Sequence, residues 1–197
     1  MAVQGVDFCM TMLPNPVLTN PKMYYNLGAL YICSVVRNAG YSVVMHDCRD
    51  GVKPFPKARF YGFSATTPEF AYAKDIAMNL DGKTIIGGAH PSLRPQDCIG
   101  TFDYTVVGEG EEVIVDILKG NYPYHVVAGK RIKNLDTVPF PAWDLVEDPF
   151  SDTLLAGEKY GTSPKAATLI GSRGCPMRPS CSFCGNVMQN PVTFRSA

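Results

Sequence analysis

The sequence predicts a doubly wound α/β domain, Rossmann- or flavodoxin-like, on a five-stranded, mainly parallel sheet. Short apolar segments alternate with helical or loop segments through residues 1–122, and several are followed by Gly, Ser or Thr. This alternation is typical of parallel strands joined by helical crossovers. Such sheets bind ligands beyond the carboxyl ends of their strands, where small residues let a ligand approach the backbone.

The individual elements follow from the spacing of apolar residues and from the turn residues between them. Thr67 is the expected N-cap of the second helix, and Pro68 suits its first position. The first and third helices are expected to stop at Gly40 and Gly120. Strands are predicted at 6–13, 41–47, 59–65, 83–89 and 103–108, and helices at 27–39, 66–80 and 111–120.

The chain divides into three parts by composition. Residues 1–122 are expected to form the α/β domain. Residues 123–164 have several prolines and little periodicity, which predicts an extended linker with a small hairpin at 125–132. Residues 165–175 read as one more strand, which runs into a loop rich in cysteine, and residues 165–197 form the last part.

Charge and targeting features favour a cytoplasmic protein with a small-molecule partner. Lys plus Arg and Asp plus Glu each number 18, so bulk charge indicates neither nucleic acid nor an acidic membrane as partner. The sequence shows no signal peptide and no apolar run of membrane-spanning length. Four cysteines lie singly and are expected to be reduced structural thiols: Cys9, Cys33, Cys48 and Cys98.

Three further cysteines, Cys175, Cys181 and Cys184, lie within ten residues near the end of the chain. Structural zinc needs four ligands; His90 or Cys98 could supply the fourth in space, but none is nearby in sequence. A redox pair would leave Cys175 unexplained. A [4Fe–4S] cluster on three thiolates leaves one iron open for another ligand. Free thiols without a metal are the last alternative.

The stretch "LIGSRGCPMRPSCSFCGN" (169–186) resembles the first strand and cluster loop of radical S-adenosylmethionine enzymes. In that family three cysteines hold a [4Fe–4S] cluster and S-adenosylmethionine chelates the fourth iron. The resemblance implies these roles for Cys175, Cys181 and Cys184. Five residues separate the first two cysteines here, where the family usually has three.

The upstream domain resembles the cobalamin-binding domain that precedes the radical core in one class of these enzymes. The resemblance rests on four stretches in the family's order: "GFSATTPEF" (62–70), "IIGGAHPS" (85–92), "DYTVVGEGEE" (103–112) and "LDTVPFPAWDLV" (135–146). Cobalamin is a corrin with a nucleotide arm, which must enter between strand ends lined by small residues. Ordinary strand-to-helix turns of a doubly wound fold are the plainer alternative for the same residues.

The resemblance yields a set of expected cofactor-binding residues after the third, fourth and fifth strands. Hydroxyl groups can hydrogen-bond the nucleotide arm, and glycines let backbone N–H groups approach its phosphate or ribose. The expected residues are Ser64, Thr66, Thr67, Gly87, Gly88, His90, Gly108, Glu109 and Gly110. The loop at 13–28 has no histidine to ligate cobalt, so binding without a protein imidazole is expected.

The implied function is the N-terminal part of a cobalamin-dependent radical S-adenosylmethionine methyltransferase. A complete barrel needs roughly 200 residues, and only its first strand and cluster loop fall within 165–197, so a C-terminal region or a partner chain would complete it. S-adenosylmethionine would bind only with that barrel. Two alternatives stay open: a standalone cobalamin carrier or sensor, and a flavodoxin-like domain with a zinc-binding tail.

Overall fold

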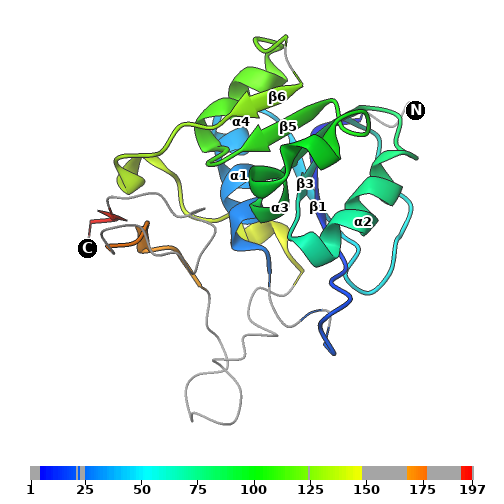
Figure 1. Ribbon diagram of the computed structural model, residues 1–197, viewed down its shortest axis with the longest axis horizontal. Helices are drawn as coiled ribbons and strands as arrows, with labels where there is room; N and C mark the ends of the chain where they lie inside the picture. Colours follow the sequence, from blue (N-terminus) through cyan, green and yellow to red (C-terminus); the bar gives the residue numbers. More distant parts are fainter. Residues whose placement is uncertain are drawn as a thin grey trace.

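The structure, a computed structural model, describes residues 5–20, 22, 25–123, 125–147, 168–176 and 192–196. In this part of the chain six strands form one parallel sheet (Figure 1). Their order across the sheet is β2 (Val43–Asp47), β1 (Val6–Met12), β3 (Ala58–Ser64), β4 (Lys83–Gly87), β5 (Tyr104–Val107) and β6 (Val126–Ala128). The predicted doubly wound α/β class is confirmed.

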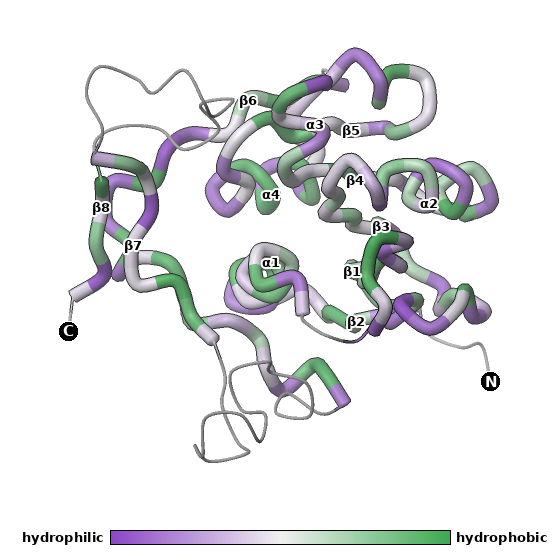
Figure 2. Tube along the Cα trace, turned by 60° about the horizontal axis from the view of Figure 1, so that its bottom comes forward, coloured by the Kyte–Doolittle hydropathy of each residue, from purple (hydrophilic) through white to green (hydrophobic). Residues whose placement is uncertain are grey.

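Helices cover both faces of the sheet. Figure 2 shows α1 and α4 on one side of the strands and α2 on the other. Apolar side chains fill both interfaces: Phe8 and Met10 of the sheet pack with Leu30 of α1, whereas Tyr61 of the sheet packs with Ile76 of α2. The helices are α1 (Leu27–Asn38), α2 (Thr67–Ala77), α3 (Ala89–Leu93) and α4 (Glu111–Leu118), with 3-10 turns at Pro95–Cys98, Leu135–Thr137 and Trp143–Leu145.

The chain changes direction across the sheet between β1 and β3. From β1 it moves to β2 on one side, then returns to β3 on the other side and continues outward. The connections after β1 and β3 therefore diverge, which opens a crevice at the carboxyl ends of these two strands. The fold thus predicts where a ligand site lies before any side chain is considered.

The strand β6 was not predicted. Residues 125–132 were expected to form a hairpin, but Val126–Ala128 pair in parallel with β5. The helix α4 lies against α1, although β6 continues the outward order of the sheet. The β5–α4–β6 crossover therefore has the opposite hand to β3–α2–β4, against the strong preference of such units for one hand. Covering the apolar face beside α1 favours this arrangement, because α4 buries Val113, Ile114 and Ile117 there.

The start of α2 differs by one residue from the prediction. Thr66, rather than Thr67, is the N-cap. The Thr66 backbone N–H and hydroxyl both donate to Glu69 Oε2 at 2.8 Å, and the Glu69 N–H donates back to the Thr66 carbonyl. This capping box satisfies backbone groups that a helix start leaves unpaired. The Thr66 hydroxyl is therefore already hydrogen-bonded within the fold.

The segment after β6 packs against α1. Tyr31 on α1 packs with Ile132, Leu135 and Val138, and its hydroxyl accepts a hydrogen bond from the Ile170 N–H at 3.0 Å. On that side of the molecule β7 (Ser172–Arg173) pairs antiparallel with β8 (Thr193–Phe194). In its described part, the strand predicted at 165–175 is therefore confined to the two residues of β7.

Candidate functional site

A large cavity of the described structure lies along β1, β3, β4 and β5 toward their carboxyl ends, between the sheet and helices α1 and α4. Its volume is about 610 Å³. Its deep walls are apolar and its rim carries glycines, two acids and two arginines. The lining includes Phe8, Met10, Gly28, Ile32, Gly62, Ser64, Ile85, Gly87, Gly88, Val106, Gly108, Glu109, Gly110, Glu111, Ile114, Arg131, Ile170, Ser172, Arg173 and Gly174.

The cavity exists because small residues occupy one face of the sheet near its carboxyl edge. Successive side chains of a strand point to opposite faces, so Gly62 and Ser64 share the face of Phe60, and Gly87 shares the face of Ile85. Large side chains at these positions would fill the space below α1 and α4. A Cβ atom at Gly62 would lie 2.4 Å from the ring of Phe8, so only glycine fits there.

Gly87, the last residue of β4, and Gly88, the next residue, have different roles. A Cβ atom at Gly87 would meet nothing closer than Val106 Cβ at 3.7 Å, so the space above it is open. Gly88 has a φ of 99°, and a Cβ atom there would lie 2.9 Å from the backbone nitrogen of Ala65. Gly88 thus shapes the turn, whereas Gly87 leaves volume for a ligand.

Ser64 is held in a fixed position at the edge of the cavity. The side-chain amide of Asn26 donates to both the carbonyl and the hydroxyl oxygen of Ser64, each at 3.1 Å. The Asn26 Oδ1 atom also accepts from the Ala29 N–H and caps α1. The Ser64 hydroxyl accepts from Asn26 and keeps its own proton available for donation. It can therefore donate to an acceptor in the cavity.

Ser92 links the turns after β4 and β5 by hydrogen bonds. The sequence analysis did not identify this residue. Its hydroxyl donates to the Gly88 carbonyl at 2.7 Å and accepts from the Gly108 N–H at 3.0 Å. Both glycines have positive φ and line the cavity. One side chain thus fixes the two glycine turns that form the rim.

The acidic part of the rim is neutralised from the C-terminal segment. Arg173 forms ion pairs with Glu111 and, at 3.6 Å, with Glu109. Burial alone would lower the pKa of Arg173, but the hydrogen bond and the charge of Glu111 raise it above its ordinary value, so Arg173 stays charged. Glu109 also accepts from the Ile132 N–H at 2.6 Å. These contacts tie residues 168–176 to the cavity.

The predicted cofactor-binding residues fall into two groups in the structure. Six line the cavity: Ser64, Gly87, Gly88, Gly108, Glu109 and Gly110. The other three, Thr66, Thr67 and His90, are not in the lining. His90 is buried and stacks on Phe70 with ring centroids 4.1 Å apart, and its Nδ1 lies 3.2 Å from the Thr67 hydroxyl. The contact of each of the nine with a cofactor stays a prediction.

The loop before α1 offers one aromatic residue to the described structure, Tyr25. The guanidinium of Arg49 lies 4.0 Å from its ring centroid, and the ring of Trp143 meets it edge-on at 5.8 Å. Arg49 is in turn paired with Asp47 at 2.8 Å. Tyr25 therefore packs within a fixed cluster.

The predicted metal ligands are described only in part. Cys175 is half-buried and follows Gly174, which lines the cavity, whereas Cys181 and Cys184 lie outside the described residues. No group of three potential metal ligands occurs within the described ranges. The scattered cysteines are free and buried, and burial raises the pKa of Cys9 to about 12, so its thiol is neutral.

Sequence reasoning missed several residues that shape the site. Gly62 interrupts an apolar strand, and a glycine inside a strand signals close approach of another group; this pattern could have identified it. Phe8, Met10 and Ile114 look like ordinary core residues in the sequence. Arg131 on the loop after β6 also lines the cavity, and no local motif marks it.

Comparisons with known proteins identify chains that are similar to this one. Residues 17–118 match the family model described as the B12 binding domain. The bacteriochlorophyllide d C-8(2)-methyltransferase of Chlorobaculum tepidum is 30% identical over 130 residues, which covers 62% of this chain and 27% of the relative.

A solved structure, that of the cobalamin-dependent S-adenosylmethionine radical enzyme OxsB with aqua-cobalamin bound, is also similar. It matches with a TM-score of 0.58 at 18% identity, over 88% of this chain and 27% of that one. This likeness shows the fold. The chain spans about a quarter of the length of both proteins. None of the helices in the described part of the chain combines the length and apolar character that a membrane crossing requires.

Proposed function

Because this chain belongs to the B12-binding domain family, we propose that its cavity receives the nucleotide arm of cobalamin, with the corrin over the carboxyl ends of the strands. The observation that carries this proposal is the open cavity of about 610 Å³ above Gly87. It lies at the point where the strand order reverses, which is where open α/β sheets bind ligands. Its apolar depth and polar rim suit an aromatic base that continues into a phosphate.

The residues present fit the parts of this cofactor. Ile32 and Ile114 from the two helices and Phe8 from the sheet offer apolar walls to the base. The Ser64 hydroxyl, oriented by Asn26, is placed to donate to a ring nitrogen or ribose oxygen. Gly108 and the residues after it would bring backbone close to the arm where it leaves the cavity.

We extend the proposal to a cobalamin-dependent radical S-adenosylmethionine methyltransferase whose barrel is completed by further chain or by a partner. The methyltransferase relative and the three-cysteine loop support this extension. Cobalamin supplies a cobalt-bound methyl group when it is loaded. In this proposal Cys175, Cys181 and Cys184 hold a [4Fe–4S] cluster. Because Gly174 lines the cavity and Cys175 follows it, the cluster loop would begin beside the cofactor.

Cobalamin binding is tested by titration of the 197-residue chain with hydroxocobalamin, followed by its visible spectrum. A saturable spectral change, or retention of the corrin after gel filtration, is the expected result. A chain that stays folded but takes up no corrin at generous excess would refute the binding proposal. An excess of free cobinamide, which lacks the nucleotide arm, should compete poorly.

The cluster is tested separately by anaerobic reconstitution with iron and sulfide. A broad absorption band near the violet should appear and should be lost when Cys175, Cys181 or Cys184 is replaced by Ser. Cys98→Ala is the matched control, because Cys98 is buried in the fold and apart from the loop. Corrin uptake without the band would favour a standalone cobalamin carrier over the methyltransferase, and zinc without corrin uptake would contradict both.

A further inference from the structure

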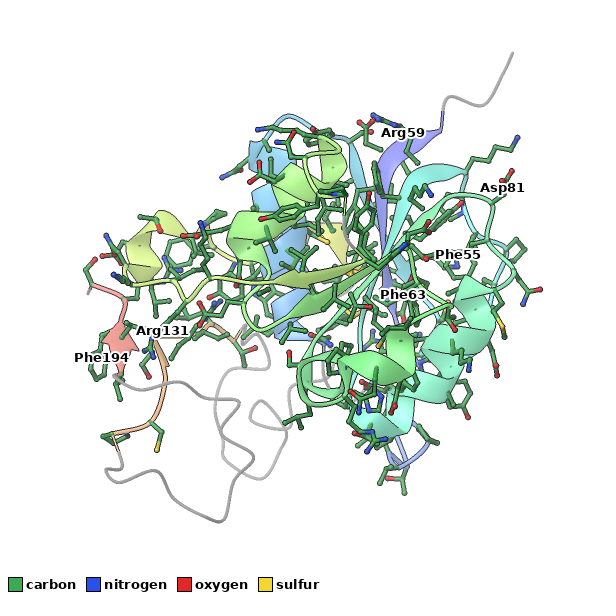
Figure 3. All side chains as sticks on the ribbon, turned by 45° about the horizontal axis from the view of Figure 1, so that its top comes forward. Phe55, Arg59, Phe63, Asp81, Arg131 and Phe194 are labelled. Carbon is green, nitrogen blue, oxygen red and sulfur yellow. The ribbon has the colours of Figure 1, made fainter. Side chains whose placement is uncertain are left out.

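The side chain of Arg131 is the one feature of the cavity that the fold leaves without an explanation. Both terminal nitrogens of its guanidinium are buried, and neither has a hydrogen-bond partner. No carboxylate of the described residues forms an ion pair with it at 4.0 Å or less. The residue lines the cavity on the loop that follows β6, and Figure 3 shows it beside the C-terminal segment.

An arrangement of this kind opposes folding unless something compensates it. A buried charge is ordinarily paired, and an uncompensated one carries a large desolvation cost. Most buried polar groups in proteins have a hydrogen-bond partner, so a buried guanidinium without one requires an explanation. The rim carboxylates do not supply one, because Glu109 and Glu111 are both engaged by Arg173.

We propose that Arg131 binds the phosphodiester of the cobalamin nucleotide arm and so anchors the cofactor at the mouth of the cavity. This inference rests on the proposed cobalamin binding and adds to it the group that is recognised. A guanidinium presents two parallel N–H donors in a planar fork that matches two oxygens of a phosphate. The unpaired atoms of Arg131 are those two terminal nitrogens.

The chemistry of the ligand favours its phosphate over its other groups. The corrin side chains of cobalamin end in neutral amides, whereas the phosphodiester carries a full negative charge. That phosphate lies between the base and the corrin, so it must sit at the mouth when the base is inside. Arg131 lines the cavity together with Arg173 and Gly108, and the same lining includes the apolar side chains of Phe8 and Met10.

The test compares Arg131→Gln with the unchanged chain in titrations with hydroxocobalamin and with cobinamide, which lacks the phosphate, ribose and base. Loss of hydrogen bonds to a charged group should weaken hydroxocobalamin binding about 10- to 100-fold. Cobinamide should bind both proteins equally. Cobinamide phosphate should bind the unchanged chain more tightly than cobinamide, and this gain should vanish in Arg131→Gln.

Two further variants sharpen the comparison. Arg131→Lys keeps the charge without the fork and should fall between the two proteins. Arg59→Gln is the matched control, because Arg59 is exposed at the start of β3, on the far side from Arg131 in Figure 3, and pairs with Asp7 at 3.2 Å. It should bind hydroxocobalamin as the unchanged chain does.

The stability of the ligand-free protein separates anchoring from a structural role. Arg131 has no partner to lose, so Arg131→Gln should unfold at the same temperature or higher. Equal hydroxocobalamin binding by Arg131→Gln and the unchanged chain would overturn the inference alone. An equal loss of cobinamide binding, or a variant that unfolds early, would also overturn it. Absence of hydroxocobalamin binding by the unchanged chain would overturn the proposed function as well.

Discussion

Replacement of Gly87 by Leu should abolish cobalamin binding while it stabilises the protein. The new side chain would enter the cavity on the face shared with Ile85 and Val106. Its first atom meets Val106 Cβ at 3.7 Å, an ordinary contact, so the backbone need not move. The rest of the side chain would occupy the space that we assign to the nucleotide arm.

The expected gain in stability can be estimated from its parts. Burial of a leucine side chain contributes about 1.5–3 kcal/mol, and removal of a glycine from a strand adds roughly 0.5–1 kcal/mol. Fixing the leucine rotamer costs about 0.5–1 kcal/mol. The net change in the free energy of unfolding is about 1–3.5 kcal/mol, which for a chain of this size raises the melting temperature by at least about 2 °C.

The assay pairs thermal unfolding, followed by circular dichroism, with the hydroxocobalamin titration. Gly87→Ala is the graded control, because it changes the backbone entropy in the same way but leaves most of the cavity open. It should therefore keep most of the binding. A Gly87→Leu protein that binds hydroxocobalamin like the unchanged chain would show that the arm does not lie above Gly87, and a marked loss of stability would show that the space is not open.

Three other perturbations test separate parts of the structure. Gly88→Ala forces a side chain onto a φ of 99° and should lower the free energy of unfolding by about 1–3 kcal/mol, measured by urea denaturation; an unchanged midpoint would contradict the assigned strain. The hydrogen bonds that Asp7 accepts from Ser42 lower the pKa of Asp7 below its ordinary 3.8, so their stabilisation is complete above that pH and disappears as the pH falls through the lower folded-state value. The Asp7→Asn protein should accordingly lose less stability than the unchanged chain in that acid range, and parallel acid titration curves would count against this. Tyr31→Phe removes the acceptor of the Ile170 N–H, so hydrogen exchange of that amide should accelerate about 2- to 10-fold with little change in the sheet.

Much of the fold was readable from the sequence because its signals are local. The first five strands are short apolar runs, and α1 begins and ends where its apolar spacing does. The strand β6 escaped prediction because its three residues carry no pattern of their own and depend on β5 for every hydrogen bond. Its connection also has the rare hand, which no local rule anticipates.

The candidate site was predictable only where glycines at strand ends indicate it. Gly87 and Gly108 follow apolar strands, and a small residue at a strand end indicates backbone approach. Arg131 could not be identified in this way, because it stands out only in the folded structure, where its terminal nitrogens are buried without a hydrogen-bond partner. His90 stands beside the glycines in sequence, yet its side chain packs on the opposite side of the sheet against Phe70, because neighbouring residues of a turn can face different layers.

Two features of the ligand-free site oppose stability, and one ligand would relieve both. The cavity leaves apolar walls around Gly87 unfilled, and Arg131 keeps a buried charge unpaired. A molecule with an aromatic base and an adjacent phosphate fills the cavity with its base and pairs Arg131 with its phosphate. The unfolded chain has neither the cavity nor the buried charge, so it does not bind this molecule. Binding to the folded state alone stabilises it by about 2.7 kcal/mol at a ligand concentration 100 times the Kd. The same two features that lower the stability of the free protein would thus provide the specificity of the cofactor site, since a ligand without the base leaves the walls exposed and one without the phosphate leaves the charge unpaired.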